Sequence, residues 1–256
     1  MRRTTTAASL MAGLILVSAC SGAKPQTAPN VAGFTVADVG TDAKPASNTT
    51  SLAGMSALEV WEKTKADADA SPSVHVAARF PEGDQFNLKL TDQGKVFGIL
   101  KLRGRTVLVR RMGAVLYLKA GSSFWAANAS SARVPELAGR WVTVRSAPTA
   151  DLKQILEYTD LDYTVSDLMS LSAAEQKSLK LVPGIKIGPR RTIGLVDDSA
   201  QDPTLVRKLY LAAGDPAVPL NFTVGNGTTE YMKFRSWGKD FTVVAPRGAV
   251  ELSQAR

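Results

Sequence analysis

Residues 73–120 alternate hydrophobic and polar positions in a way that predicts consecutive β-strands. The expected strands are 73–80, 85–91, 95–103, 105–111 and 114–120. Short turns containing glycine separate most of them, and such turns between alternating runs are typical of β-hairpins. The stretch should therefore form an antiparallel meander with one face on an apolar interior.

The third to fifth of these strands are apolar on both faces. Phe97 and Ile99, for example, stand beside Val96 and Leu100. A strand that is apolar on both faces is usually covered on both. We therefore expect further elements to pack on this part of the sheet, and the helical segments elsewhere are the candidates.

A helix should precede the meander, because Ser56 and Glu59 form a capping box. It should end before Ser71-Pro72 and lie across the meander. Its expected apolar stripe is narrow and consists of Leu58, Trp61 and either Lys65 or Ala68.

After the meander, residues 121–140 are loop-like with one helical turn, and 140–144 is a short strand. Residues 149–180 show a helical pattern, with a second capping box at Ser172 and Glu175. The last third returns to alternation, with expected strands at 191–198, 204–213, 217–225, 228–236 and 240–245.

This order predicts an α+β fold, a large curved antiparallel sheet of about ten strands with the helices gathered on one face. A twisted sheet of that size tends to curl.

The N-terminus has the pattern of an export signal. Arg2 and Arg3 precede a short apolar run at 7–17, which is too short to span a bilayer comfortably. Val17-Ser18-Ala19-Cys20 then resembles a bacterial lipobox. We expect residues 1–19 to be a lipoprotein signal peptide. After its cleavage, Cys20 should carry a lipid anchor in which diacylglycerol is bound to the sulfur and palmitate is an acyl group. The alternative is an ordinary secretion signal with a chance cysteine.

Residues 20–54 are rich in Ala, Ser, Thr, Gly and Pro and should be a flexible linker. As flexible coil it would span about 30 Å. A segment of it at 31–39 could instead pair with the sheet. We place the folded domain at 55–256 and expect it to fold without the linker.

Charge and cysteine content narrow the function classes. The formal charge is +8, and the leader contributes two arginines and no acid, which leaves +6 on the remainder. This suits an anionic membrane surface or an acidic polymer, and no nucleic-acid motif accompanies it. Cys20 is the single cysteine, so no disulfide can form within one chain.

The sequence offers little for catalysis. His75 is the single histidine and is expected to be solvated on a strand. There is no G-x-S-x-G, H-E-x-x-H, P-loop or G-x-G-x-x-G pattern. The acidic pairs Asp160/Asp162 and Asp197/Asp198 do not follow a calcium loop. We expect a protein that is not an enzyme and has no metal and no cofactor.

Two basic spots, Arg190-Arg191 and the group Arg103, Arg105, Arg110 and Arg111, match phosphate chemistry. Their alternative interpretation is charge for solubility.

The ordered features together resemble a known family. They are the lipobox, the spacer, the capped helix with Trp61, the meander, Phe124-Trp125, the element 138–142, and a second meander ending near Ala245-Pro246. This order is similar to the actinobacterial envelope lipoproteins of the LppX/LprG group, within the LolA/LolB-like fold. The resemblance implies a half-barrel whose sheet and helices enclose an apolar cavity, bordered by 121–139 and 184–191, that holds lipid or lipoglycan acyl chains in transit.

Burial of an acyl chain contributes about 0.8 kcal/mol per methylene and needs no catalytic group. Our expected cavity wall consists of one alternating set from several strands, namely Phe86, Leu88, Leu90, Leu100, Leu102, Leu116, Leu118, Leu209, Leu211, Phe222 and Val224.

The expected function is a monomeric carrier on the outer face of the cell membrane, anchored through Cys20, with a membrane transporter as a further partner. The alternative is an envelope sensor that contacts a membrane protein, as RseB/MucB-type relatives do. Those relatives have an additional C-terminal domain, whereas this chain ends soon after its last expected strand, which favours the carrier.

Overall fold

The computed structural model describes residues 52–252 apart from 148, 198, 200–201 and 228–229. Cys20, the leader and most of the linker lie outside the described residues. Leu52, at the start of the described part, is buried in the hydrophobic core.

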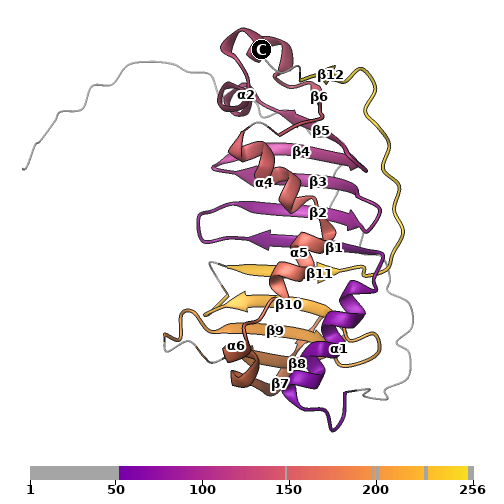
Figure 1. Ribbon diagram of the computed structural model, residues 1–256, viewed down its shortest axis with the longest axis vertical. Coiled ribbons are helices and arrows are strands. Elements are labelled where there is room, and N and C mark those ends of the chain that lie inside the picture. The colour runs from indigo at the N-terminus through magenta and orange to yellow at the C-terminus, as the bar shows by residue number, and fades with distance from the viewer. Residues whose placement is uncertain (1–51, 148, 198, 200–201, 228–229, 253–256) are drawn as a thin grey trace, which may run out of the picture. The chain divides into compact units, whose positions relative to one another are not determined.

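The described residues form one open sheet of twelve strands, stacked along the long axis in Figure 1. The spatial order is β12-β6-β5-β4-β3-β2-β1-β11-β10-β9-β8-β7. Neighbours pair antiparallel except β12 and β6, which are parallel, so the sheet is mixed. The strands are β1 (Ser73–Arg79), β2 (Gln85–Thr91), β3 (Lys95–Leu102), β4 (Arg105–Met112), β5 (Val115–Ala120), β6 (Trp141–Val144), β7 (Leu179–Ile187), β8 (Arg190–Asp197), β9 (Arg207–Ala212), β10 (Pro219–Val224), β11 (Tyr231–Arg235) and β12 (Val250–Glu251).

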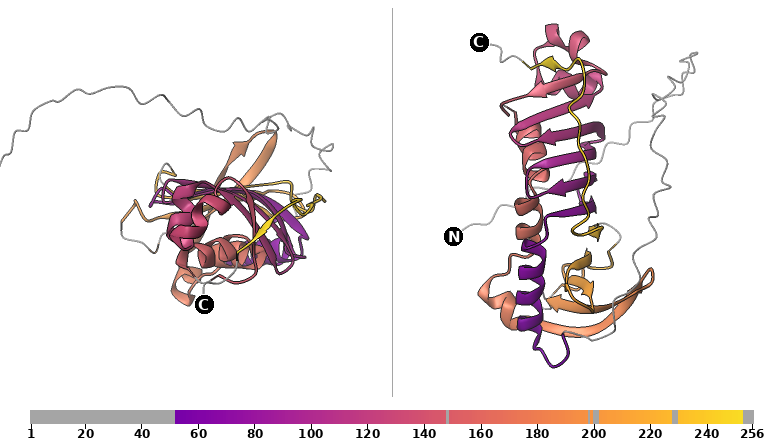
Figure 2. Two further views of the ribbon diagram at one scale, coloured as in Figure 1. Left: turned by 90° about the horizontal axis from the view of Figure 1, so that it is seen from above. Right: turned by 90° about the vertical axis from the view of Figure 1, so that its right-hand side faces the viewer.

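The longer helices lie on one face of the sheet, here called the inner face, and the sheet curves around them (Figure 2). The predicted α+β class and half-barrel are therefore confirmed. The helices are α1 (Ala57–Asp69), α2 (Ser122–Asn128), a 3₁₀ turn η1 (Ser131–Arg133), α3 (Val134–Leu137), α4 (Ala150–Tyr158), α5 (Leu161–Leu168) and α6 (Ala173–Ser178).

Both predicted capping boxes are present, because Ser56 and Ser172 each exchange hydrogen bonds with the glutamate three residues later. The expected stripe of α1 was partly right, because Ala68 is buried and Trp61 packs partly buried against the core. The other fully buried side chains, Val60 and Thr64, were not expected. Thr64 is tolerated there because its hydroxyl donates to the Val60 carbonyl at 2.7 Å. The expected position of α1 was wrong, because it lies over the β7–β10 end of the sheet rather than across the first meander (Figure 1).

Strand register puts the predicted set of leucines in continuous rows on the inner face. Leu88 pairs with Val76 and Gly98, and Leu118 pairs with Val109 and Val142. Nine of the eleven residues predicted for the cavity wall are buried in the core cluster, and Phe222 is packed partly buried against it. Val224 is partly exposed.

The outer face of the first meander is covered by the C-terminal segment, not by helices as we expected. Phe241 packs edge-on against Phe97 with ring centroids 5.3 Å apart. Arg110 Nη1 donates to the Val244 carbonyl at 2.9 Å, and its guanidinium lies over Trp141. This segment returns along the sheet from β11 to β12 (Figure 1), so the strand predicted at 240–245 was wrong.

Helix α4 is held on the inner face by arginines at both ends of β4. Arg103 Nη1 and Arg105 Nη2 lie 2.8 Å and 3.2 Å from the carboxylate oxygens of Asp151, which is buried in the first turn of α4. At the other end, Arg111 Nη1 donates to the Thr159 carbonyl at 2.9 Å. Acids at a helix N-terminus and cations at its C-terminus both complement the helix dipole.

Strand β7 was not predicted. Residues 184–191 were expected to be a loop bordering the cavity, but they form the outer part of a hairpin made by β7 and β8. The alternation of Leu179, Leu181, Ile185 and Ile187 was interrupted by Pro183-Gly184, which looks like a turn in sequence and is a register shift in the structure.

Candidate functional site: an apolar pocket at the β7 end of the sheet

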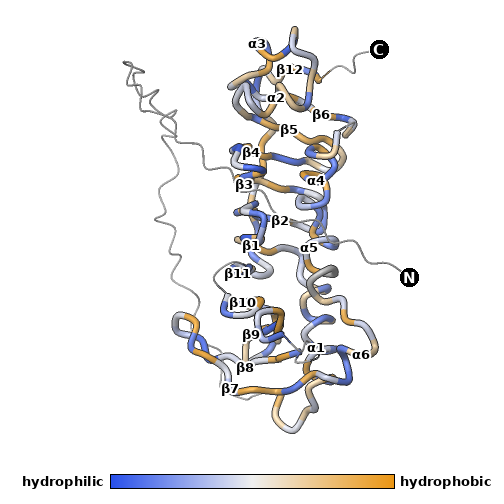
Figure 3. The backbone as a smooth tube through the Cα atoms, turned by 90° about the vertical axis from the view of Figure 1, so that its left-hand side faces the viewer, coloured by the Kyte–Doolittle hydropathy of each residue, from blue (hydrophilic) through white to orange (hydrophobic). Residues whose placement is uncertain are grey.

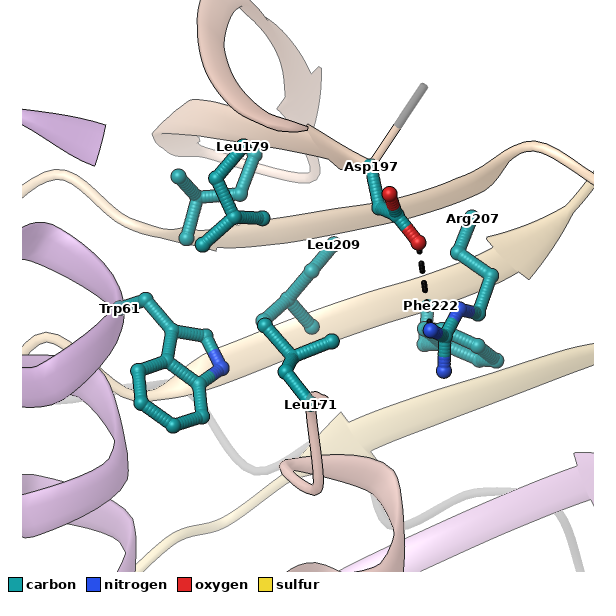
Figure 4. A pocket seen from close by; sticks show the side chains of 8 residues that line it. Trp61, Leu171, Leu179, Asp197, Arg207, Leu209 and Phe222 are labelled. Atoms are coloured by element: carbon teal, nitrogen blue, oxygen red, sulfur yellow. Dashed lines mark hydrogen bonds and ion pairs between the residues drawn. The ribbon is translucent and has the colours of Figure 1, made fainter. Parts of the chain in front are cut away.

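A pocket opens between the inner face and the helices at the end of the sheet that carries β7. Eight side chains line it: Trp61, Leu171, Leu179, Leu195, Asp197, Arg207, Leu209 and Phe222. Figure 4 shows Trp61, Leu171, Leu179 and Leu209 toward one side of the pocket, and Phe222 beside the pair of Asp197 and Arg207. The pocket is small and open to solvent on one side.

The apolar walls come from both layers of the fold. Trp61 projects from α1, whose neighbouring stripe of Val60, Thr64 and Ala68 is buried. Leu171 stands in the short link between α5 and α6. The link is fixed because Gln176 Nε2 donates to the Leu171 carbonyl at 3.2 Å and Ser172 caps α6.

The strand side of the pocket follows from register. Leu195 pairs with Leu209, and Leu209 pairs with Phe222, so the three side chains form one row across β8, β9 and β10. Their alternation along each strand is what places them on the inner face together.

The polar side of the pocket is a connected network. Arg207 Nη2 lies 3.2 Å from Asp197 Oδ2 and also pairs with Glu175 of α6. Asp197 Oδ1 accepts from Ser178 Oγ at 2.6 Å and from the Ser199 amide at 3.0 Å. Burial opposes ionisation of Asp197, but these hydrogen bonds from serines outweigh it and lower its pKa.

The lining is mostly apolar and has a few polar groups, which is the usual composition of a small-molecule site. Among the described residues, no three His, Cys, Asp or Glu side chains are grouped so that they could hold a metal ion.

The pocket takes in two of the eleven residues predicted for a cavity wall, Leu209 and Phe222. The residues from β2, β3 and β5, with Leu211, lie in the core, where the most buried have no exposed surface. A ligand-binding role for the predicted set stays a prediction. Sequence reasoning did not select Leu171, Leu179, Leu195, Asp197 or Arg207 for this site. Leu195 and Leu179 follow strand alternation and could have been found, whereas Leu171 lies in a link with no periodicity.

The predicted basic spot at Arg103, Arg105, Arg110 and Arg111 is not one site. Arg103, Arg105 and Arg111 bind the two ends of α4, while Arg110 contacts the C-terminal segment on the outer face. Their guanidinium groups therefore hold α4 and the C-terminal segment against the sheet.

His75 is half-buried on β1, not fully solvated. Its Nε2 lies 2.5 Å from Asn87 Oδ1. Burial, together with the positive charges of Arg235 and Lys89, lowers the His75 pKa, although the Asn87 hydrogen bond opposes this.

None of the helices in the described part of the chain has the length and apolar content needed to cross a bilayer.

Comparison with known proteins shows the fold. No protein-family model matches this chain, and no curated protein matches it. Among solved structures it is similar to LprF from Mycobacterium bovis, at 15% sequence identity and a TM-score of 0.51, over 75% of this chain and 97% of LprF.

Two other structures match with lower scores. The Mycobacterium tuberculosis lipoprotein LppX gives 11% identity and a TM-score of 0.45, over 73% of this chain and 98% of LppX. The MucA/MucB complex of Pseudomonas aeruginosa gives 15% identity and a TM-score of 0.32, over 75% of this chain and 59% of that one. The resemblance to the LppX/LprG group expected from the sequence is therefore confirmed as a likeness of fold, the one that this chain shares with LprF.

Proposed function

We propose that this protein is an envelope lipoprotein that binds the acyl part of a lipid or lipoglycan in the pocket at the β7 end of the sheet and carries or presents it across the envelope. The observation that carries the proposal is the lining of that pocket, with Trp61, Leu171, Leu179, Leu195, Leu209 and Phe222 meeting in one open space.

The driving force is burial of apolar surface. Each methylene removed from water contributes about 0.8 kcal/mol. Even a short acyl segment therefore gains several kcal/mol, part of which is offset by the entropy lost on binding. The pocket's open mouth allows the remainder of the ligand to stay in solvent.

The charged side chains beside the pocket, Glu175, Asp197 and Arg207, favour one kind of lipid headgroup. Asp197 and Glu175 face the single guanidinium of Arg207, so these three side chains leave no spare positive charge for a phosphate. Hydroxyl groups, such as those of a glycan, can still bond to the carboxylates. A glycolipid fits these side chains better than an acidic phospholipid.

Attachment to the outer face of the cell membrane through Cys20 is part of the proposal, motivated by the Val17–Cys20 motif. Cys20→Ser should release the protein from washed membranes into the soluble fraction. A variant that is processed and stays membrane-bound like the wild type would contradict the anchor.

The ligand site is tested by photocrosslinking. A fatty acid carrying a diazirine should label peptides that contain Leu171, Leu179 or Phe222, and an excess of unlabelled glycolipid should reduce that labelling. Labelling confined to peptides of β2–β5 would contradict the proposed position. The absence of saturable labelling anywhere would contradict lipid binding itself.

A further inference from the structure

The hairpin of β7 and β8 projects from the body of the sheet, away from the helices (Figure 2). Its outer part carries large apolar side chains in solvent: Leu181 is 42% exposed and Ile185 is 44% exposed. Pro183 and Pro189 are exposed as well. Isolated exposed apolar residues are ordinary, but several along one projecting hairpin mark an interaction surface.

The same hairpin is strongly basic. From Leu179 to Ile193 the sequence contains Lys180, Lys186, Arg190 and Arg191 and no acid. Lys186, Arg190 and Arg191 are exposed, and Lys186 pairs across the hairpin with Arg191. Figure 3 shows strongly polar and apolar residues side by side along this tip.

The edge of β7 is unsuited to pairing with another strand. β7 ends the sheet, so its outer edge could in principle accept a strand from a second protein. However, Pro183 lacks an amide proton, the register shifts between Pro183 and Lys186, and lysines flank the break. Proline, bulges and lysine are the features that block edge-to-edge pairing.

The bulge itself depends on Gly184. A Cβ placed there would lie 1.6 Å from the Thr192 carbonyl oxygen, so this close approach of backbones admits glycine alone. Thr192 Oγ1 in turn donates to the Ile185 carbonyl at 2.6 Å. These contacts fix the break in the hairpin that carries Ile185 and Lys186.

We propose that the β7–β8 tip, residues 181–191, is a membrane-docking element that binds the surface of an anionic phospholipid bilayer, with Leu181 and Ile185 entering the interface and Lys186, Arg190 and Arg191 contacting phosphates. Basic side chains near an anionic surface each strengthen binding, and apolar side chains between them add burial at the headgroup boundary. Leu179 and Leu195, at the base of the same hairpin, line the pocket. Docking through the tip does not depend on the pocket being filled.

The test uses the chain from Ser21 to Arg256, so that neither the leader nor an acyl anchor contributes. All residues of the hydrophobic core described here lie between Leu52 and Leu252, so this truncation removes no core side chain. Co-sedimentation with vesicles of phosphatidylcholine containing phosphatidylglycerol is compared with sedimentation on pure phosphatidylcholine. Arg190→Ser with Arg191→Ser should lower the partition coefficient on the anionic vesicles by roughly tenfold.

The matched control is Lys95→Ser with Lys101→Ser, which removes the same charge from exposed positions of β3. It should lower the partition coefficient much less. Equal effects of the two double variants would overturn the proposal, because binding would then follow net charge alone. Binding by neither wild type nor variants would also overturn it.

Insertion of the tip is measured separately. The Ser21–Arg256 chain has no cysteine, so Ile185→Cys can be labelled with an environment-sensitive dye. Its emission should shift to the blue on anionic vesicles, and a dye at Lys101→Cys should not shift. The same emission at both positions with and without vesicles would contradict docking through the tip.

Discussion

The two halves of the sheet cover the same inner face in different ways. In the half made of β1–β6, leucines and valines from neighbouring strands pack under α4, whose ends are bound by Arg105 and Arg111. In the half made of β7–β11, the covering elements are α1, the link at Leu171 and the short α6, and a pocket remains between them and the strands.

The difference shows that alternation along strands decides which side chains face inward but not whether they are packed. Leu90 and Leu209 both follow the inward pattern. Leu90 has no exposed surface, whereas Leu209 is 8% exposed and lines the pocket. The two residues differ in what covers them, because Leu209 borders the space that Trp61 and Leu171 also line.

The largest effect is expected where α4 is bound to β4. Asp151→Ala removes the buried carboxylate that both Arg103 and Arg105 contact. Breaking a buried pair typically costs about 3–5 kcal/mol, and because Arg103 is largely exposed we expect about 3 kcal/mol in urea unfolding.

The control for this variant is Glu251→Ala, which breaks the exposed pair with Arg145 at 3.1 Å. That pair should contribute less than about 1 kcal/mol. Equal losses from the two variants would mean that the ion pairs at Asp151 do not hold the packed half together.

The next prediction compares the same substitution in the two halves. Leu90→Trp overpacks a filled core and should lower the free energy of unfolding by about 1–3 kcal/mol. Leu171→Trp enlarges a side chain that borders open space and should change it by less than about 1 kcal/mol. Thermal or urea unfolding of both variants measures this difference, and equal destabilisation would remove the distinction between the halves.

The smallest expected effect concerns His75, on the strand that joins the halves through pairing with β11. Its lowered pKa means that the unfolded chain binds a proton more readily than the folded one, so stability falls as pH drops through the ordinary histidine range near 6.5. His75→Gln should reduce the loss of melting temperature between pH 7.5 and 5.5. An unchanged pH dependence would show that another group is responsible.

Much of the fold could be predicted from sequence. Capping boxes predicted the starts of α1 and α6, and alternation predicted the strands of the first meander and β8–β11 of the second. Three features could not be predicted in this way. The outer cover, residues 236–249, belongs to no strand, and β7 contains Pro183. The stripe of α1 includes Thr64, whose burial depends on a hydrogen bond within the helix.

The site was less predictable for a physical reason. A pocket is space that side chains fail to fill, and that depends on the length and position of the covering helices. The strand residues Leu209 and Phe222 were within the predicted set, but Trp61 and Leu171 reach the pocket from the other layer. The hydrophobic periodicity of a single segment does not indicate that side chains from two layers will line the same pocket.

The central claim is that the open half holds lipid and the packed half does not. The most direct measurement is the lipid content of the purified protein, by extraction and mass spectrometry, together with the melting temperature, for wild type, Leu171→Trp and Leu90→Trp. The account predicts bound lipid in the wild type, its loss with little change in melting temperature in Leu171→Trp, and lower melting with lipid retained in Leu90→Trp. A wild type free of lipid, or full lipid content in Leu171→Trp, would contradict it.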